Sequence, residues 1–367
     1  MSIAEFVESE TRKARAVMKM VWDTLENNEL CGKMDTNKSL QEGQQLQSRL
    51  HTFPQRRYCA VTASHCLEVF VEGKNAWKRL FLIDNCDVQG GLTFFTVDQE
   101  VYAAIGRKRG IAIYNVREQE EIEVNMLLDD TKGSAFECLS VIGEAGMLNQ
   151  HLFAAHSRRG VVEIHLDSLV GVQSREIQEK DIFYSAVGKD HVKLAVAGNS
   201  VFVSEDRVVS EFLLSRELVE KKQYDEAVYA LAVECVQDSE KKVYAGTQGG
   251  NILCNGEMFF STGNTLSTIA KMHLGNYHNQ EGVFYITYTK GTYSPLYFTE
   301  GSTTEVVSRG GVFESVRDFA IDQQGRFLLL SDDRDVSRGR VEVQGGENKS
   351  SIAFNGKGKK IALYGGN

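Results

Sequence analysis

The chain has 367 residues, of which 42% are hydrophobic and 25% are charged, a balance typical of a soluble protein with an apolar core. Its formal net charge of −9 argues against a general nucleic-acid coat, which needs a broad positive field. No apolar run approaches the roughly 18 residues that a membrane-spanning helix requires, so we expect no membrane contact.

The N-terminal sequence and the cysteines indicate in which cellular compartment the protein resides. The first residues, MSIAEFVESETRKAR, are charged and contain no apolar segment of the secretory kind. The chain holds seven cysteines; none forms a Cys-x-x-Cys pair, and most lie in apolar runs where a reduced cysteine acts as a small hydrophobe. We therefore expect a reducing environment, either cytoplasmic or nuclear.

Residues 1–52 differ from the rest of the chain and are expected to form a helical arm. Apolar side chains recur there at spacings of three and four, which is one stripe of an amphipathic helix. The stripe consists of Val17, Met18, Val21, Trp22 and Leu25. It either packs on the main domain or pairs with a helix of a partner protein, and the sequence leaves both interpretations open.

From residue 53 to residue 367 the apolar period changes to two, and we predict an all-β domain. Hairpins of one kind repeat: an apolar run, a glycine-rich or polar turn, and an alternating run. They are spaced roughly 40 to 50 residues apart, which with about four strands per unit indicates propeller blades. The hairpins start at Tyr58, Tyr102, Phe153, Leu194, Val243, Phe284 and Phe327.

Further apolar runs supply the remaining strands. The innermost strands are predicted at 92–97, 136–142, 182–187, 228–233, 266–272 and 316–321. The first hairpin has no such run before it, whereas 359–366 is left over at the C-terminus. We predict that this segment completes the first blade and removes an exposed sheet edge. Seven blades is the natural count, and six or eight also fit because the outer strands are weakly marked.

In period and strand pattern, residues 53–367 resemble a WD40-like seven-bladed β-propeller. Blades of that family often end their third strand in Trp-Asp, and the nearest counterpart in this chain is Tyr114-Asn115. The layout of helical arm and propeller is also similar to that of G-protein β subunits, whose first helix pairs with a partner helix. The resemblance implies that the turns between second and third strands emerge on the face usually used for partners.

Motifs for catalysis and metal binding are absent from the sequence. There is no H-E-x-x-H, no G-x-S-x-G and no phosphate-binding G-x-x-x-x-G-K-[ST]. The pairs His151/His156 and His273/His278 are five residues apart, so on a strand their members face opposite sides of the sheet. We expect structural or surface roles for these histidines, with no catalytic residue, no metal and no cofactor. The alternative is a hydrolase or lyase whose site lies in the axial channel.

Basic residues gather in the predicted turns between second and third strands. In the ring they would form an arc over blades seven, one, two and three, whereas blades four and five carry the uncharged turns AGNS and GTQGG. The hypothesis is a protein-interaction scaffold on which this arc docks an acidic or phosphorylated partner segment. Arginine could equally serve only to keep the turns soluble. The arc comprises Arg107, Lys108, Arg109, His156, Arg158, Arg159, Arg334, Arg338 and Arg340.

Overall fold

A computed structural model divides the chain into two units, Met1–Gln55 and Arg56–Asn367. The predicted arm, with Val17, Met18, Val21, Trp22 and Leu25, lies outside the described residues. Within the described part of the chain, no helix is both apolar enough and long enough to cross a bilayer. The structure describes residues 56–63, 66–73, 76–84, 90–97, 100–126, 135–143, 150–157, 159–169, 172–186, 192–236, 240–309, 315–321, 326–332, 338–344, 350–355 and 358–364.

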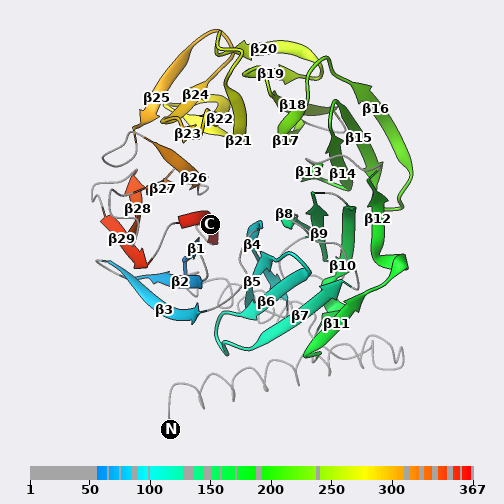
Figure 1. Ribbon diagram of the computed structural model, residues 1–367, viewed down its shortest axis with the longest axis vertical. Helices are drawn as coiled ribbons and strands as arrows, with labels where there is room; N and C mark the ends of the chain where they lie inside the picture. The colour runs from blue at the N-terminus through cyan, green and yellow to red at the C-terminus, as the bar shows by residue number, and fades with distance from the viewer. Residues whose placement is uncertain are drawn as a thin grey trace, which may run out of the picture. The chain divides into compact units, whose positions relative to one another are not determined.

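The second unit is a seven-bladed β-propeller, as the sequence predicts (Figure 1). Its sheets follow one another around a ring, each with an inner strand near the axis and an outer strand at the rim. From the inner strand outward, blade one contains β30 (Gly358–Tyr364), β1 (Tyr58–Ala63), β2 (Cys66–Glu72) and β3 (Trp77–Asp84). In the same order, blade two contains β4 (Leu92–Val97), β5 (Glu100–Gly106), β6 (Gly110–Asn115), β7 (Glu121–Met126) and β11 (Ser174–Ile177). Blade three contains β8 (Phe136–Ile142), β9 (His151–His156), β10 (Gly160–His165) and β12 (Ile182–Ser185).

The remaining blades complete the ring, and two short 3-10 helices lie in the connections of blade three. Blade four contains β13 (Val192–Ala197), β14 (Ser200–Glu205), β15 (Val208–Leu213) and β16 (Leu218–Gln223). Blade five contains β17 (Val228–Val236), β18 (Glu240–Thr247), β19 (Asn251–Cys254) and β20 (Glu257–Ser261). Blade six contains β21 (Thr268–Tyr277), β22 (Gln280–Thr289), β23 (Thr292–Tyr293), β24 (Leu296–Thr299) and β25 (Thr304–Ser308). Blade seven contains β26 (Val316–Ile321), β27 (Phe327–Asp332), β28 (Arg338–Gln344) and β29 (Ser350–Asn355), and the helices are η1 (Leu166–Leu169) and η2 (Glu179–Asp181).

The C-terminal strand closes the ring within blade one. β30 pairs antiparallel with β1, with Tyr364 opposite Tyr58 and Gly358 opposite Ala63. The rings of Tyr58 and Tyr364 lie 6.2 Å apart between centroids, and the Tyr364 hydroxyl is 2.7 Å from Thr96 Oγ1 of blade two. The predicted closure by the leftover segment is therefore confirmed.

The predicted register of blade four is wrong by one strand. The run at 182–187 was expected to be its innermost strand, but β12 pairs with β10 and is the outer strand of blade three. The reason is β11, which leaves blade three and pairs in parallel with β7 of blade two. The hairpin starting at Leu194 consequently supplies the first and second strands of blade four, where the second and third were predicted.

The apolar core lies between neighbouring blades, as expected where each sheet buries both faces. One cluster joins blades two and three through Ile113, Phe136 and Ile164, all essentially inaccessible to solvent. A much smaller cluster joins blades four and five, and it consists of Val209, Tyr224, Val228 and Ala245 among the described buried residues. The boundaries between blades thus differ in how much apolar surface they bury.

Candidate functional site

The turns between second and third strands accept backbone hydrogen bonds from residues at the start of the next blade. The backbone N–H of Phe136 in blade three donates to the carbonyl of Arg107 in the turn of blade two, at 3.2 Å. Val228 of blade five donates in the same way to Asp206 in the turn of blade four, at 2.7 Å. These turns therefore lie on the same face as the connections that enter the inner strands, and hydrogen bonds fix their backbones.

Arg107 is held by its own blade. Its Nη2 lies 2.7 Å from Glu121 Oε1 and its Nη1 lies 3.6 Å from Glu123 Oε1, both on β7. Nη2 also donates to the Tyr114 hydroxyl at 2.7 Å. These contacts tie the guanidinium to the third and fourth strands of blade two, so Arg107 stabilises the hairpin and offers little charge to a partner.

His156, which was expected to contact a partner, is buried and offers little surface for such a contact. The residue is only 1% exposed, and its ring meets that of Phe136 edge-on at 5.1 Å between centroids. His156 is the last residue of β9, and Phe136 begins the neighbouring inner strand. The side chain therefore packs beneath the turn, and sequence position alone could not distinguish this from exposure on the turn.

The remaining basic residues of the predicted arc divide between exposed and undescribed positions. Arg109 and Arg159 are exposed, and Lys108 is half-buried. Arg340 is exposed, with its Nε 4.0 Å from Glu342 Oε1. Arg158, Arg334 and the side chain of Arg338 lie outside the described residues.

The corrected register changes the charge that blade four contributes. The AGNS segment joins β13 to β14, so it lies between first and second strands, on the face opposite to the other turns. The turn between second and third strands is instead Asp206-Arg207, in which Arg207 is exposed. The sequence interpretation missed Arg207 because it placed the AGNS segment, and not Asp206-Arg207, between the second and third strands of blade four.

Blade five adds no positive charge to this face, because the turn between its second and third strands is hydrogen-bonded to a carboxylate. Glu226 accepts hydrogen bonds from the Thr247 hydroxyl, from the Gly249 backbone at 3.1 Å and from Asn251 Nδ2 at 3.3 Å. The charge on this face thus changes sign between Arg207 of blade four and Glu226 before blade five. The neighbouring blades two, three and four carry Lys108, Arg109, Arg159 and Arg207.

The inner strands around the axis bring ionisable groups of different blades together. Lys193 Nζ of β13 binds Glu137 Oε2 of β8 at 2.7 Å, and Lys271 of β21 binds Asp318 of β26. The second Asp318 oxygen accepts the backbone N–H of Ile361 of β30, at 2.9 Å. These contacts link the inner strands of successive blades.

Desolvation and neighbouring charges lower the pKa values of two residues on the inner strands around the axis. Burial lowers the pKa of Lys271, and the nearby Lys360 ammonium lowers it further, against the opposing effect of Asp318. Desolvation among the inner strands and the Lys271 charge together lower the pKa of His273 to about 4, although part of its side chain meets solvent. His273 is therefore a neutral imidazole at physiological pH. The paired residues come from separate blades at irregular spacing, so local motif searching could not find them.

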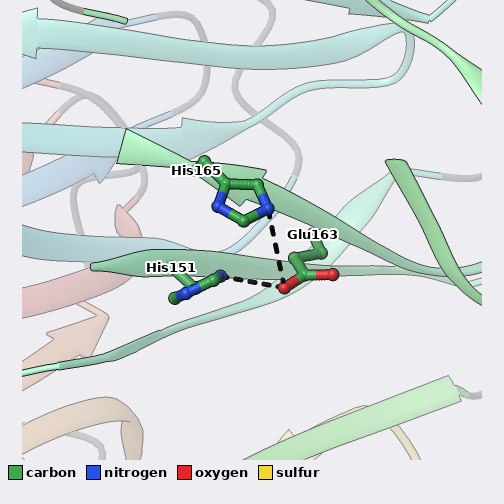
Figure 2. Close-up of side chains that lie close together, drawn as sticks. All are labelled: His151, Glu163 and His165. Atoms are coloured by element: carbon green, nitrogen blue, oxygen red, sulfur yellow. Dashed lines mark hydrogen bonds and ion pairs between the residues drawn. The ribbon is translucent and has the colours of Figure 1, made fainter. Parts of the chain in front are cut away.

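A third group of ionisable residues lies on blade three, where β9 begins and β10 ends. His151, Glu163 and His165 have their side chains directed toward one another (Figure 2). The five-residue spacing of His151 and His156 along β9 gives no indication of this group. Cross-strand pairing brings His151 opposite His165 instead, and this pairing could be read from the predicted hairpin.

Comparison with known proteins supports the architecture. No protein-family model matches the chain, and no curated protein matches it either. Among solved structures it is similar to dihydro-heme d1 dehydrogenase NirN in complex with DHE, with a TM-score of 0.50 and 12% identity over 85% of this chain and 78% of that one. The fold is a β-propeller. At this identity the likeness extends to the fold alone.

Two further similarities are weaker. A chain of the mitotic checkpoint complex aligns with a TM-score of 0.45 and 9% identity, covering 80% of this chain and 82% of that one. BBS1N in complex with ARL6DN aligns with a TM-score of 0.41 and 13% identity, covering 60% of this chain and 71% of that one.

Proposed function

We propose that this chain is a non-enzymatic scaffold, WD40-like in kind, that binds an acidic or phosphorylated segment of a partner protein on one face of its propeller. The observation that carries the proposal is the set of basic turn residues on three neighbouring blades. We call this set the basic turn surface, and it comprises Lys108, Arg109, Arg159 and Arg207.

The chemistry of the basic turn surface suits an anionic segment. Guanidinium groups bind carboxylates and phosphates through paired, charge-assisted hydrogen bonds. On a chain of net charge −9, a local positive surface selects acidic partners and accelerates their encounter. Because the turn backbones are bonded to neighbouring blades, binding does not require ordering of the turns, which lowers its entropic cost.

The basic arc is proposed to extend to blade seven through Arg334, Arg338 and Arg340. The stripe of Val17, Met18, Val21, Trp22 and Leu25 is proposed as a second contact, with a partner helix. A cytoplasmic or nuclear location and the absence of catalysis belong to the same proposal. The described carboxylates Glu137 and Asp318 near the axis support it, because each already binds a lysine.

Charge reversal on the basic turn surface tests the proposal. The triple variant Arg109→Glu, Arg159→Glu, Arg207→Glu is compared with wild type for binding to immobilised acidic and phosphoserine peptides. We expect affinity for the peptides that wild type binds to fall by at least about tenfold. A matched control reverses three exposed charges outside the surface, through Arg117→Glu, Lys180→Glu and Lys221→Glu.

The control variant carries the same change in net charge, so it separates local recognition from a general electrostatic effect. We expect the control to bind the peptides within about twofold of wild type and to melt at a similar temperature. Equal binding by wild type and the first variant, with both folded, would contradict the proposal. So would an equal loss in both variants.

A further inference from the structure

Strand pairing in blade three places three potential metal ligands on one side of the sheet. His151 and His165 are directly opposite each other on β9 and β10, and Glu163 lies two residues before His165. Residues two apart on a strand point to the same face, so Glu163 and His165 share the face on which His151 lies. Figure 2 shows the three side chains converging from the two strands.

The distances among the ligand atoms fit a small metal ion. His151 Nδ1 lies 2.8 Å from Glu163 Oε1, and His165 Nε2 lies 4.0 Å from the same oxygen. All three ligand atoms lie within 4.8 Å of one another. In a tetrahedral zinc site with bonds of about 2.0–2.1 Å, ligand atoms are about 3.3 Å apart. The observed separations bracket that value, so small rotations of the side chains suffice to surround an ion.

The carboxylate is held in place by Arg216 from blade four. Arg216 Nη2 donates to Glu163 Oε2 at 2.9 Å, which leaves Oε1 directed to the histidines. The guanidinium also donates to the carbonyls of Ile182 and Lys180, at 3.1 and 2.7 Å. Such outer contacts orient a ligating carboxylate and tune its affinity for the metal.

The site combines a buried anchor with an open entrance. Glu163 is only 4% exposed, whereas the His165 side chain is 58% exposed. A buried carboxylate and its arginine partner give little net stability compared with apolar residues, so stability alone gives little reason to place a carboxylate between two imidazoles. The exposed imidazole lets an ion enter from solvent and leaves one coordination position accessible.

We propose that His151, Glu163 and His165 bind a divalent transition-metal ion, with Zn²⁺ as the preferred occupant. Two imidazoles and one carboxylate suit zinc, whereas Mg²⁺ and Ca²⁺ favour sites made of oxygen ligands. The fourth position is open to water or to a side chain of a partner. The site lies at the ends of β9 and β10 away from the Arg159 turn, so it is separate from the basic turn surface and independent of the proposed function.

Metal titration of the full-length chain tests the site. Chelator-treated protein is titrated with Zn²⁺ against a chromophoric chelator, and with Co²⁺ to record the visible absorption of four-coordinate cobalt. We expect one equivalent of Zn²⁺ to bind. His165→Ala and His151→Ala should weaken binding by at least about 100-fold, exceeding the roughly 10- to 100-fold effect of outer contacts. His278→Asn is the matched control and should bind like wild type.

The control removes an exposed imidazole from a turn at φ +51°, where asparagine is tolerated. Glu163→Gln is a further variant, because glutamine keeps the volume and an acceptor for Arg216 while losing the charge that binds the metal. It should lose Zn²⁺ affinity and keep its melting temperature in the absence of metal. Failure of wild type to bind one equivalent, or unchanged binding by folded His165→Ala and Glu163→Gln, would overturn the proposal. An equal loss in His278→Asn would also overturn it.

Discussion

The boundary between blades two and three and the boundary between blades four and five hold the ring together in different ways. The first buries large apolar side chains, including Ile113, Phe136 and Ile164. The second has a small apolar cluster around Val209 and Tyr224. Beside it lies a cavity of about 300 Å³, lined by residues of both blades, including Glu211, Lys222 and Lys241.

Polar contacts replace apolar burial at the second boundary. Lys241 Nζ of blade five binds Glu211 Oε1 of blade four at 2.5 Å and donates to Ser200 Oγ at 2.7 Å. The hydrogen bond from the Val228 backbone N–H to the Asp206 carbonyl adds to these contacts. Net stabilisation per polar contact is small because water competes for the same groups. The ring is therefore not equally strong all round, and its polar boundary lies away from the closing strand β30.

The largest expected effect is at the apolar boundary. Phe136→Ala removes a fully buried ring that contacts His156, and we expect it to lower the free energy of unfolding by about 3–5 kcal/mol. Urea denaturation followed by tyrosine and tryptophan fluorescence measures the change. Leu218→Ala on the exposed part of β16 is the control and should cost less than about 0.5 kcal/mol. A small effect of Phe136→Ala would show that apolar burial does not hold blades two and three together.

The next effect is at the polar boundary. Lys241→Met leaves the largely buried Glu211 carboxylate without its cation, and we expect a loss of about 1–3 kcal/mol in the free energy of unfolding. The double variant Glu211→Gln, Lys241→Met removes both charges and should recover most of that loss. Denaturation of the single and double variants forms a double-mutant cycle. Additive losses would show that the pair does not couple the two blades.

The smallest effect is a pH dependence at the same boundary. Burial, with a contribution from Glu220, raises the pKa of Tyr224 to about 12, against about 10 in the unfolded chain. The folded state keeps the proton longer, so stability is full below pH 10 and falls as pH rises from 10 to 12. Tyr224→Phe should reduce this loss by about 1 kcal/mol at pH 11. An unchanged alkaline profile would indicate that Tyr224 ionises freely.

The repeating architecture could be predicted because its signals are local. Alternation of apolar residues marks most strands, and the surplus segment near Leu363 predicts the closure that Tyr58 and Tyr364 make. The register of blade four could not be predicted in the same way. The segment Ser174–Ile177 pairs with a strand of the preceding blade, and alternation within a segment does not encode its partner.

The candidate sites were predicted only in part because tertiary contacts decide what each side chain does. Arg107 and Arg109 look alike in sequence, but the carboxylates of β7 bind Arg107 while Arg109 is exposed. His156 belongs to a basic turn in sequence and packs against Phe136 in the structure. Glu163 and Arg216 are 53 residues apart, so no motif of local spacing joins them.

The excursion of β11 has a mechanical consequence. The chain leaves blade three after β10, runs alongside β7 of blade two as β11, and returns to blade three as β12 (Figure 1). Blades two and three are therefore linked by a segment that adds the outermost strand to blade two before the chain returns to blade three, with Arg175 of β11 bound to Asp181 at 2.6 Å on the return. A force that pulls the propeller apart has to separate β11 from β7 and also disrupt the apolar packing between blades two and three. Rupture should instead begin at the boundary between blades four and five.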